Sequence, residues 1–126
     1  FVSSIIGFFS LLLTQSIIFQ TVRPSFLDVM ETKLFYVGVA IAEENIFRFY
    51  LFTMVYLYAG GGWRGFLLGT IVTTSIFVPW HFYVYPFFAN LLAVAASNVI
   101  LCFVYWESEL RLSVPMLVHA LVNFVA

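Results

Sequence analysis

The side chains best able to do chemistry stand inside long apolar runs of this chain. They are two acids, a guanidinium, two imidazoles and an amide: Glu43, Glu44, Arg48, His81, His119 and Asn123. An ionisable group inside a membrane-spanning helix costs at least ~2.5–3.5 kcal/mol, and such groups face a cavity or one another. Together they make up the inventory of a hydrolytic site, with a base for water and donors for an oxyanion.

The two adjacent acids are expected to differ in their surroundings. At 100° per residue, Glu44 and Arg48 lie about 40° apart on a helix, whereas Glu43 and Arg48 lie about 140° apart. We therefore expect Arg48 to pair with Glu44. Glu43 then lacks a local cation and is the carboxylate suited to act as a general base. The alternative is a structural ion-pair triad that fixes the helix register.

Each histidine shares a helix face with a second residue one turn away. Phe77 precedes His81 by four residues, and His119 precedes Asn123 by the same spacing. His119 and Asn123 could donate to one oxygen atom, or they could link helices by hydrogen bonds worth ~0.6–2 kcal/mol. His81 taken alone is better explained as a buried neutral ring bonded to a backbone carbonyl. Two further amides lack ionisable neighbours and are expected to be structural: Asn90 and Asn98.

Composition indicates that these residues are positioned by membrane helices. Hydrophobic residues make up 63% and charged residues 9%, against a usual ~45–50% and ~25%. This composition argues against a soluble globular enzyme, a disordered chain, a collagen and a coiled coil. The net charge is −1 and the five basic residues are scattered, so we expect no nucleic-acid partner.

The hydrophobic runs predict an all-α fold, a polytopic transmembrane bundle with about five membrane helices. Crossing the hydrocarbon requires roughly 20 mostly apolar residues, and unpaired strand edges cannot lie in lipid. The expected spans are Phe1–Gln20, Leu34–Tyr58, Phe66–Tyr85, Phe87–Trp106 and the start of a fifth, Val114–Ala126. We divide the chain into an accessory helix with a polar connector over 1–33 and a catalytic bundle over 34–126. We expect it to be a fragment of a longer membrane protein, cut at both ends.

The two histidines pose a geometric problem for straight, parallel spans. Counting 1.5 Å per residue from the expected ends places His81 and His119 ~16 Å apart along the membrane normal. A typical tilt of ~20° recovers only part of this difference. We therefore predict that the third span continues past Tyr85 or that the fifth starts well outside the membrane. If neither holds, one histidine does not belong to the site.

Known intramembrane protease chemistries narrow the choice of mechanism. The H-E-x-x-H pattern of a site-2-type metalloprotease is missing from the sequence. The single aspartate, Asp28, cannot form the pair of a presenilin-type protease, and no serine has the small-residue frame of a rhomboid-type nucleophile. Water activated by a carboxylate is the chemistry that remains.

The ordered set of motifs resembles a known family. The motifs are Glu43-Glu44-x-x-x-Arg48, Phe77-x-x-x-His81 and His119-x-x-x-Asn123, on successive hydrophobic helices. Over 34–126 they resemble the CPBP family, which comprises type II CAAX prenyl endopeptidases and the bacterial Abi proteins for bacteriocin processing or immunity. The stretch Asn45-Ile46-Phe47 departs from the small or leucine-rich residues often found there.

The resemblance implies a membrane endopeptidase of the glutamic type. It assigns water activation to Glu43 with His81. It assigns oxyanion stabilisation to His119 and Asn123. The supporting residues are Glu44, Arg48 and Phe77. No cofactor is expected, although the family is often labelled metalloprotease, and Glu43, His81 and His119 could supply a His₂Glu zinc set as an alternative.

The resemblance also implies where the protein acts and on what. We expect a multi-pass integral protein of the cell membrane, surrounded by the lipid bilayer, with a peptide or a prenylated protein as substrate. The sequence does not predict an oligomeric state. Two non-peptidase alternatives are kept: a proton-coupled transporter, since intramembrane acids and imidazoles also form proton paths, and an immunity or binding protein without enzymatic activity.

Overall fold

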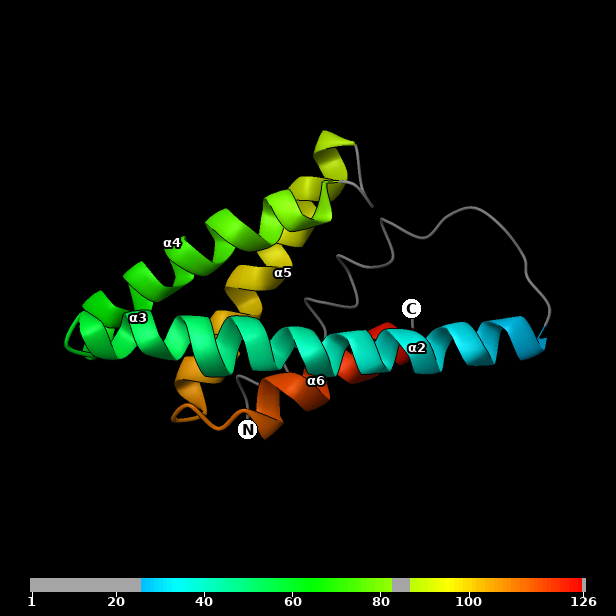
Figure 1. Ribbon diagram of the computed structural model, residues 1–126, viewed down its shortest axis with the longest axis horizontal. Coiled ribbons are helices and arrows are strands. Elements are labelled where there is room, and N and C mark those ends of the chain that lie inside the picture. The colour runs from blue at the N-terminus through cyan, green and yellow to red at the C-terminus, as the bar shows by residue number, and fades with distance from the viewer. Residues whose placement is uncertain (1–25, 83–86, 126) are drawn as a thin grey trace.

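The computed structural model describes residues 26–82 and 87–125, and all regular elements in these ranges are helical (Figure 1). The all-α prediction is confirmed for this part of the chain. The expected first span, Phe1–Gln20, lies outside the described residues. The elements are α2 (Phe26–Glu44), the π-helix η1 (Asn45–Phe52), α3 (Thr53–Tyr58), α4 (Gly62–His81), α5 (Phe88–Glu107) and α6 (Ser113–Val125).

The first three elements form one uninterrupted rod along the long axis of the molecule (Figure 1). It starts at Phe26 rather than at the expected Leu34, so residues 26–33, which were assigned to the polar connector, are helical. Hydropathy drops where charges begin, but charged residues are good helix formers, and the helix continues through them. Within the rod, η1 replaces α-helical bonding with wider i→i+5 turns, a rare geometry that is frequent at functional sites.

The remaining helices pack against this rod in two ways. α6 lies beside α2, whereas α4 and α5 form a second pair that crosses the rod obliquely (Figure 1). α6 runs antiparallel to α2, because its later residues contact earlier residues of α2. The contacts pair Glu44 with His119, Tyr36 with Asn123, and Lys33 with Val125.

Two tight turns fold the helices back on one another. Gly60–Gly62 all have positive φ, of 87°, 71° and 60°, a backbone region that favours glycine, and they connect α3 to α4. After α5, the left-handed residues Glu109 and Leu110 close the helix, and the Leu110 N–H bonds the Tyr105 carbonyl at 3.0 Å. Pro115 lies in the first turn of α6, where a missing N–H costs nothing.

Apolar side chains form the core between these helices and also cover much of the outside. Of the described helices, α5 is the one that is both long enough and apolar enough to cross a membrane by itself. α6 is apolar but shorter. The expectation of about five membrane helices therefore stays a prediction.

Gly65 allows α4 to approach α3 closely. A Cβ atom at this position would lie 2.7 Å from the carbonyl oxygen of Tyr56, a backbone atom that cannot rotate away. Gly65→Ala should therefore destabilise the fold by ~1–3 kcal/mol, measured as a lower midpoint of thermal unfolding in detergent. Gly38→Ala is the matched control, because a Cβ there meets nothing within 4 Å. Equal losses in the two variants would contradict the close α3–α4 approach.

Candidate active site

Glu43 lies between the two histidine rings. Its Oε1 atom is 3.4 Å from Nε2 of His81, and its Oε2 atom is 3.8 Å from Nε2 of His119. The three side chains come from α2, α4 and α6, and each is only 10–14% exposed. A carboxylate and two imidazoles from distant parts of the sequence thus meet in a largely shielded position that solvent still reaches.

The meeting of both histidines at Glu43 corrects the depth estimate. α4 ends at His81, so the prediction that the third span continues past Tyr85 is wrong. α6 begins at Ser113, next to the expected Val114, and a start outside the membrane stays a prediction. The estimate assumed straight, parallel spans, whereas α4 crosses the rod obliquely (Figure 1).

The hydrogen bonds of the two rings indicate which nitrogen carries the proton. His81 Nδ1 lies 2.8 Å from the Phe77 carbonyl oxygen, and His119 Nδ1 lies 2.8 Å from Glu44 Oε1. A carbonyl and a carboxylate only accept, so each Nδ1 is the donor. In the neutral rings both Nε2 lone pairs then face Glu43. A water molecule can satisfy such a nitrogen and the carboxylate together by donating one hydrogen to each.

Glu44 and Arg48 form a fully buried ion pair beside this group. Arg48 Nη1 lies 3.3 Å from Glu44 Oε1, and both side chains are 0% exposed. The pair that the spacing predicts is therefore present. The same Oε1 atom accepts from His119, so one carboxylate oxygen holds both the arginine and the histidine. Arg48 Nη2 also donates to the backbone carbonyl of Asn98 at 3.4 Å.

Phe77 connects the arginine to the other histidine. Its ring lies 4.2 Å from the His81 ring, centroid to centroid, and 5.3 Å from the Arg48 guanidinium carbon. Its carbonyl also accepts the bond from His81 Nδ1. Phe47 packs edge-on against the Phe77 ring at 4.8 Å. Phe77 therefore restrains the orientation of His81 through both its backbone and its ring.

Asn123, like His119, bonds a residue of α2. Its Nδ2 atom donates to the backbone carbonyl of Tyr36 at 3.1 Å. Tyr36 lies two helical turns before Glu43 on α2, about 10 Å along the axis. A common helix face does place both residues against α2. In these bonds the two residues contact different turns of α2, and their convergence on one substrate oxygen stays a prediction.

Asn98 is a site neighbour that the sequence reasoning treated as structural. Its side chain is buried, and its Nδ2 atom donates to Thr74 Oγ1 of α4 at 2.8 Å, a link between two helices of the kind expected of a structural amide. Its backbone carbonyl, however, accepts from Arg48. Every residue carries a carbonyl, so no sequence pattern marks this contact.

The zinc alternative involves the same three side chains, Glu43, His81 and His119. Across residues 26–82 and 87–125, no three His, Cys, Asp or Glu side chains are arranged to hold a metal ion. Glu43 instead directs one oxygen to each imidazole. The three side chains nevertheless have the His₂Glu composition of catalytic zinc sites. Zinc binding therefore stays a prediction that a chelation experiment tests.

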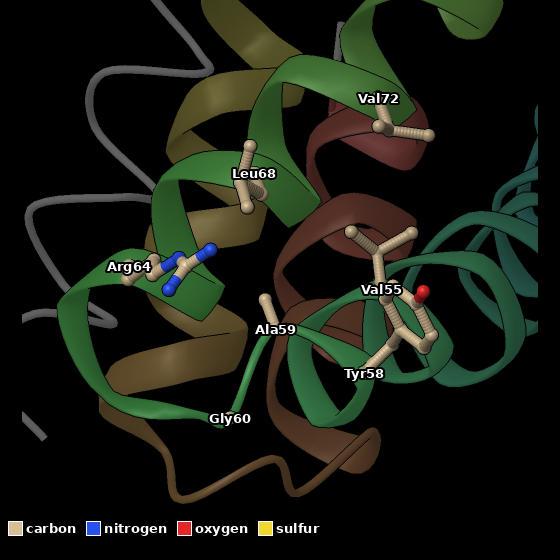
Figure 2. Close-up of a pocket in the computed structure, with 7 residues that line it drawn as sticks. All are labelled: Val55, Tyr58, Ala59, Gly60, Arg64, Leu68 and Val72. Atoms are coloured by element: carbon tan, nitrogen blue, oxygen red, sulfur yellow. The ribbon is translucent and has the colours of Figure 1, made fainter.

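A pocket elsewhere on the molecule does not contain these residues. It lies beside the turn between α3 and α4, with Arg64 at its edge (Figure 2). Its lining is otherwise mostly apolar and comprises Val55, Tyr58, Ala59, Gly60, Leu68 and Val72. The pocket thus lies near the start of α4, whereas His81 is the last residue of that helix.

Comparison with known proteins identifies the family. The sequence model of the family described as type II CAAX prenyl endopeptidase Rce1-like matches residues 25–125. The chain belongs to this family. The CPBP resemblance is thereby confirmed, and with it membership of a membrane-embedded family of CAAX-type endopeptidases. No curated protein and no solved structure matches the chain.

Removal of Arg48 should lower the unfolding free energy of the protein, because it leaves the buried Glu44 carboxylate unpaired. Arg48→Met leaves Glu44 without a cation in a fully buried position, so we expect a loss of ~3–5 kcal/mol in unfolding free energy. Arg111→Met is the control, because Arg111 pairs with Glu109 while both are more than 70% exposed. An exposed pair contributes ~0–1 kcal/mol. Similar thermal unfolding of the two variants would contradict a buried Glu44–Arg48 pair.

Proposed function

We propose that this chain is an intramembrane peptidase in which Glu43 activates water for attack on a peptide bond. The observation that carries the proposal is the placement of Glu43 between the Nε2 atoms of His81 and His119, at 3.4 and 3.8 Å. Both rings are fixed through Nδ1, so both direct Nε2 toward the same carboxylate.

In this mechanism the water lies between Glu43 and His81. It donates one hydrogen to the carboxylate and the other to His81 Nε2, which accepts because Nδ1–H is held on the Phe77 carbonyl. Glu43 takes a proton as the water oxygen bonds to the carbonyl carbon of the substrate. Glu43 then gives this proton to the amine nitrogen as the peptide bond breaks, which returns the carboxylate to its starting state.

Two donors are assigned to the oxyanion that forms on the substrate. His119 donates from Nε2 after that nitrogen has taken up a proton from solvent, while Nδ1–H stays on Glu44. Asn123 is assigned the second hydrogen bond. Its Nδ2 atom donates to the Tyr36 carbonyl at 3.1 Å, which restrains the direction of the amide. Preorganised donors of this kind are often the largest catalytic term.

The substrate we propose is the carboxyl-terminal CAAX segment of a prenylated peptide or protein. The family's description supports this class of substrate. We further propose a multi-pass protein of the cell membrane. Large exposed apolar side chains support this, since they suit contact with lipid better than with water. Five of them are 59–69% exposed: Phe35, Phe49, Leu57, Ile71 and Trp80.

Glu43→Gln should abolish cleavage while the protein stays folded. The amide keeps the size of the side chain but cannot accept the proton from water, so we expect a ~10²–10⁴-fold loss of kcat. The measurement is release of the terminal peptide from a prenylated CAAX peptide by the full protein in lipid vesicles. Glu31→Gln, an exposed acid on the same helix, is the matched control and should retain full activity.

Retained cleavage by Glu43→Gln would overturn the proposed mechanism. A wild-type protein that cleaves nothing but carries a Glu43-dependent proton flux across vesicles would instead support a transporter.

Chelation distinguishes a metal-free mechanism, in which Glu43 and His81 activate the water, from a zinc mechanism. We expect cleavage to survive dialysis against a strong chelator, because Glu43 and His81 are sufficient to hold and deprotonate the water. The measurement is kcat before and after dialysis, with metal content determined on the same samples. Loss of activity that is restored by zinc would reassign Glu43, His81 and His119 as metal ligands.

A further inference from the structure

The π-helix η1 directly follows the two glutamates and carries Arg48. An i→i+5 turn rotates the chain less per residue than an α-helix does, so it changes the direction in which side chains after Glu44 point. Arg48 lies inside this segment and simultaneously reaches Glu44 and the Asn98 carbonyl. The direction of the guanidinium therefore depends on the π winding.

Thr53 secures the end of this segment. Its backbone N–H and its hydroxyl both bond the Arg48 carbonyl oxygen, the hydroxyl at 3.0 Å. The backbone bond spans five residues and is thus a π-type bond. The hydroxyl is a second donor to the same carbonyl oxygen. It favours the π winding because the Thr53 hydroxyl meets a carbonyl five residues earlier only in the wider turn.

A second hydroxyl, from α5, holds Thr53 in place. Tyr105 Oη lies 2.9 Å from Thr53 Oγ1, and Tyr105 is 1% exposed. A threonine hydroxyl has a single hydrogen, which the Arg48 carbonyl already takes, so Tyr105 must be the donor to Thr53. The result is a directed chain from the Tyr105 phenol through Thr53 to the backbone of Arg48.

We propose that Thr53 and Tyr105 are positioning residues that keep η1 in its π winding and thereby direct Arg48, Glu44 and His119. The inference rests on the proposed peptidase function for its kinetic consequence. Neither residue contacts Glu43 through a described bond, and neither belongs to the motifs of the sequence. Their role is exerted through the backbone of Arg48, whose guanidinium holds the oxygen that orients His119.

The kinetic test compares three substitutions in the full protein in vesicles. Thr53→Val removes the donor to Arg48 and should lower kcat about tenfold, the scale of one buried hydrogen bond, with KM changed less than twofold. Thr53→Ser retains the hydroxyl and should restore kcat. Adding Tyr105→Phe to Thr53→Val should cause no further loss, because the two hydroxyls act as one unit.

Thr74→Val is the matched control. The Thr74 hydroxyl also donates to a carbonyl of its own helix, at 2.7 Å, and also bonds a residue of α5, the Asn98 amide, at 2.8 Å. It touches no residue of η1 through these bonds. The proposal predicts that Thr74→Val loses stability to a similar degree while kcat stays within twofold of wild type. An equal loss of kcat in the two valine variants would reduce Thr53 to a general packing role and overturn the proposal.

A readout without catalysis keeps this inference separable from the peptidase function. Amide hydrogen exchange over residues 44–53 should accelerate in Thr53→Val, at least tenfold, and not in Thr74→Val or Glu43→Gln. Unchanged exchange in Thr53→Val would overturn the proposal even if the wild type cleaves its peptide. If the wild type cleaves nothing while exchange responds as expected, the peptidase function fails and the role of Thr53 in the π winding stands.

Discussion

A single carboxylate oxygen, Oε1 of Glu44, organises the site. It lies 3.3 Å from the Arg48 guanidinium and 2.8 Å from His119 Nδ1, with the acid and the arginine fully buried. A buried charge is tolerated only when it is paired and hydrogen-bonded. The acid therefore requires both partners, and in binding them it fastens α6 to the rod and directs His119 Nε2 toward Glu43.

The adjacent acid, Glu43, has different surroundings because a helix rotates by about 100° between neighbouring residues. Glu44 points into the protein and meets its cation, whereas Glu43 points to the two imidazoles and remains 14% exposed. Phe77 gives the second imidazole its direction, by accepting from Nδ1 and by packing against the ring. Two neighbouring residues of one type thus have different surroundings, a fully buried ion pair for Glu44 and a position between two imidazoles for Glu43.

The sequence allowed the local relations within each helix to be predicted, such as the Glu44–Arg48 pair at one-turn spacing and the shared face of Phe77 and His81. Relations between helices were less accessible. The angles at which the helices cross decide whether His81 and His119 meet, and these angles cannot be predicted from the hydropathy of the sequence. The partner of Asn123 is a backbone carbonyl, and the π winding of η1 depends on a hydroxyl from α5, so neither leaves a pattern in the local sequence.

The proposed mechanism requires that water, rather than a protein atom, bonds to the carbonyl carbon of the substrate. A single turnover in ¹⁸O-labelled water, with enzyme in excess over a prenylated CAAX peptide, tests this directly by mass spectrometry. The account predicts one ¹⁸O atom in the newly formed carboxylate of the product and no label in the protein. An unlabelled product together with ¹⁸O in the side chain of Glu43 would show that the glutamate attacks the substrate itself, and would contradict it.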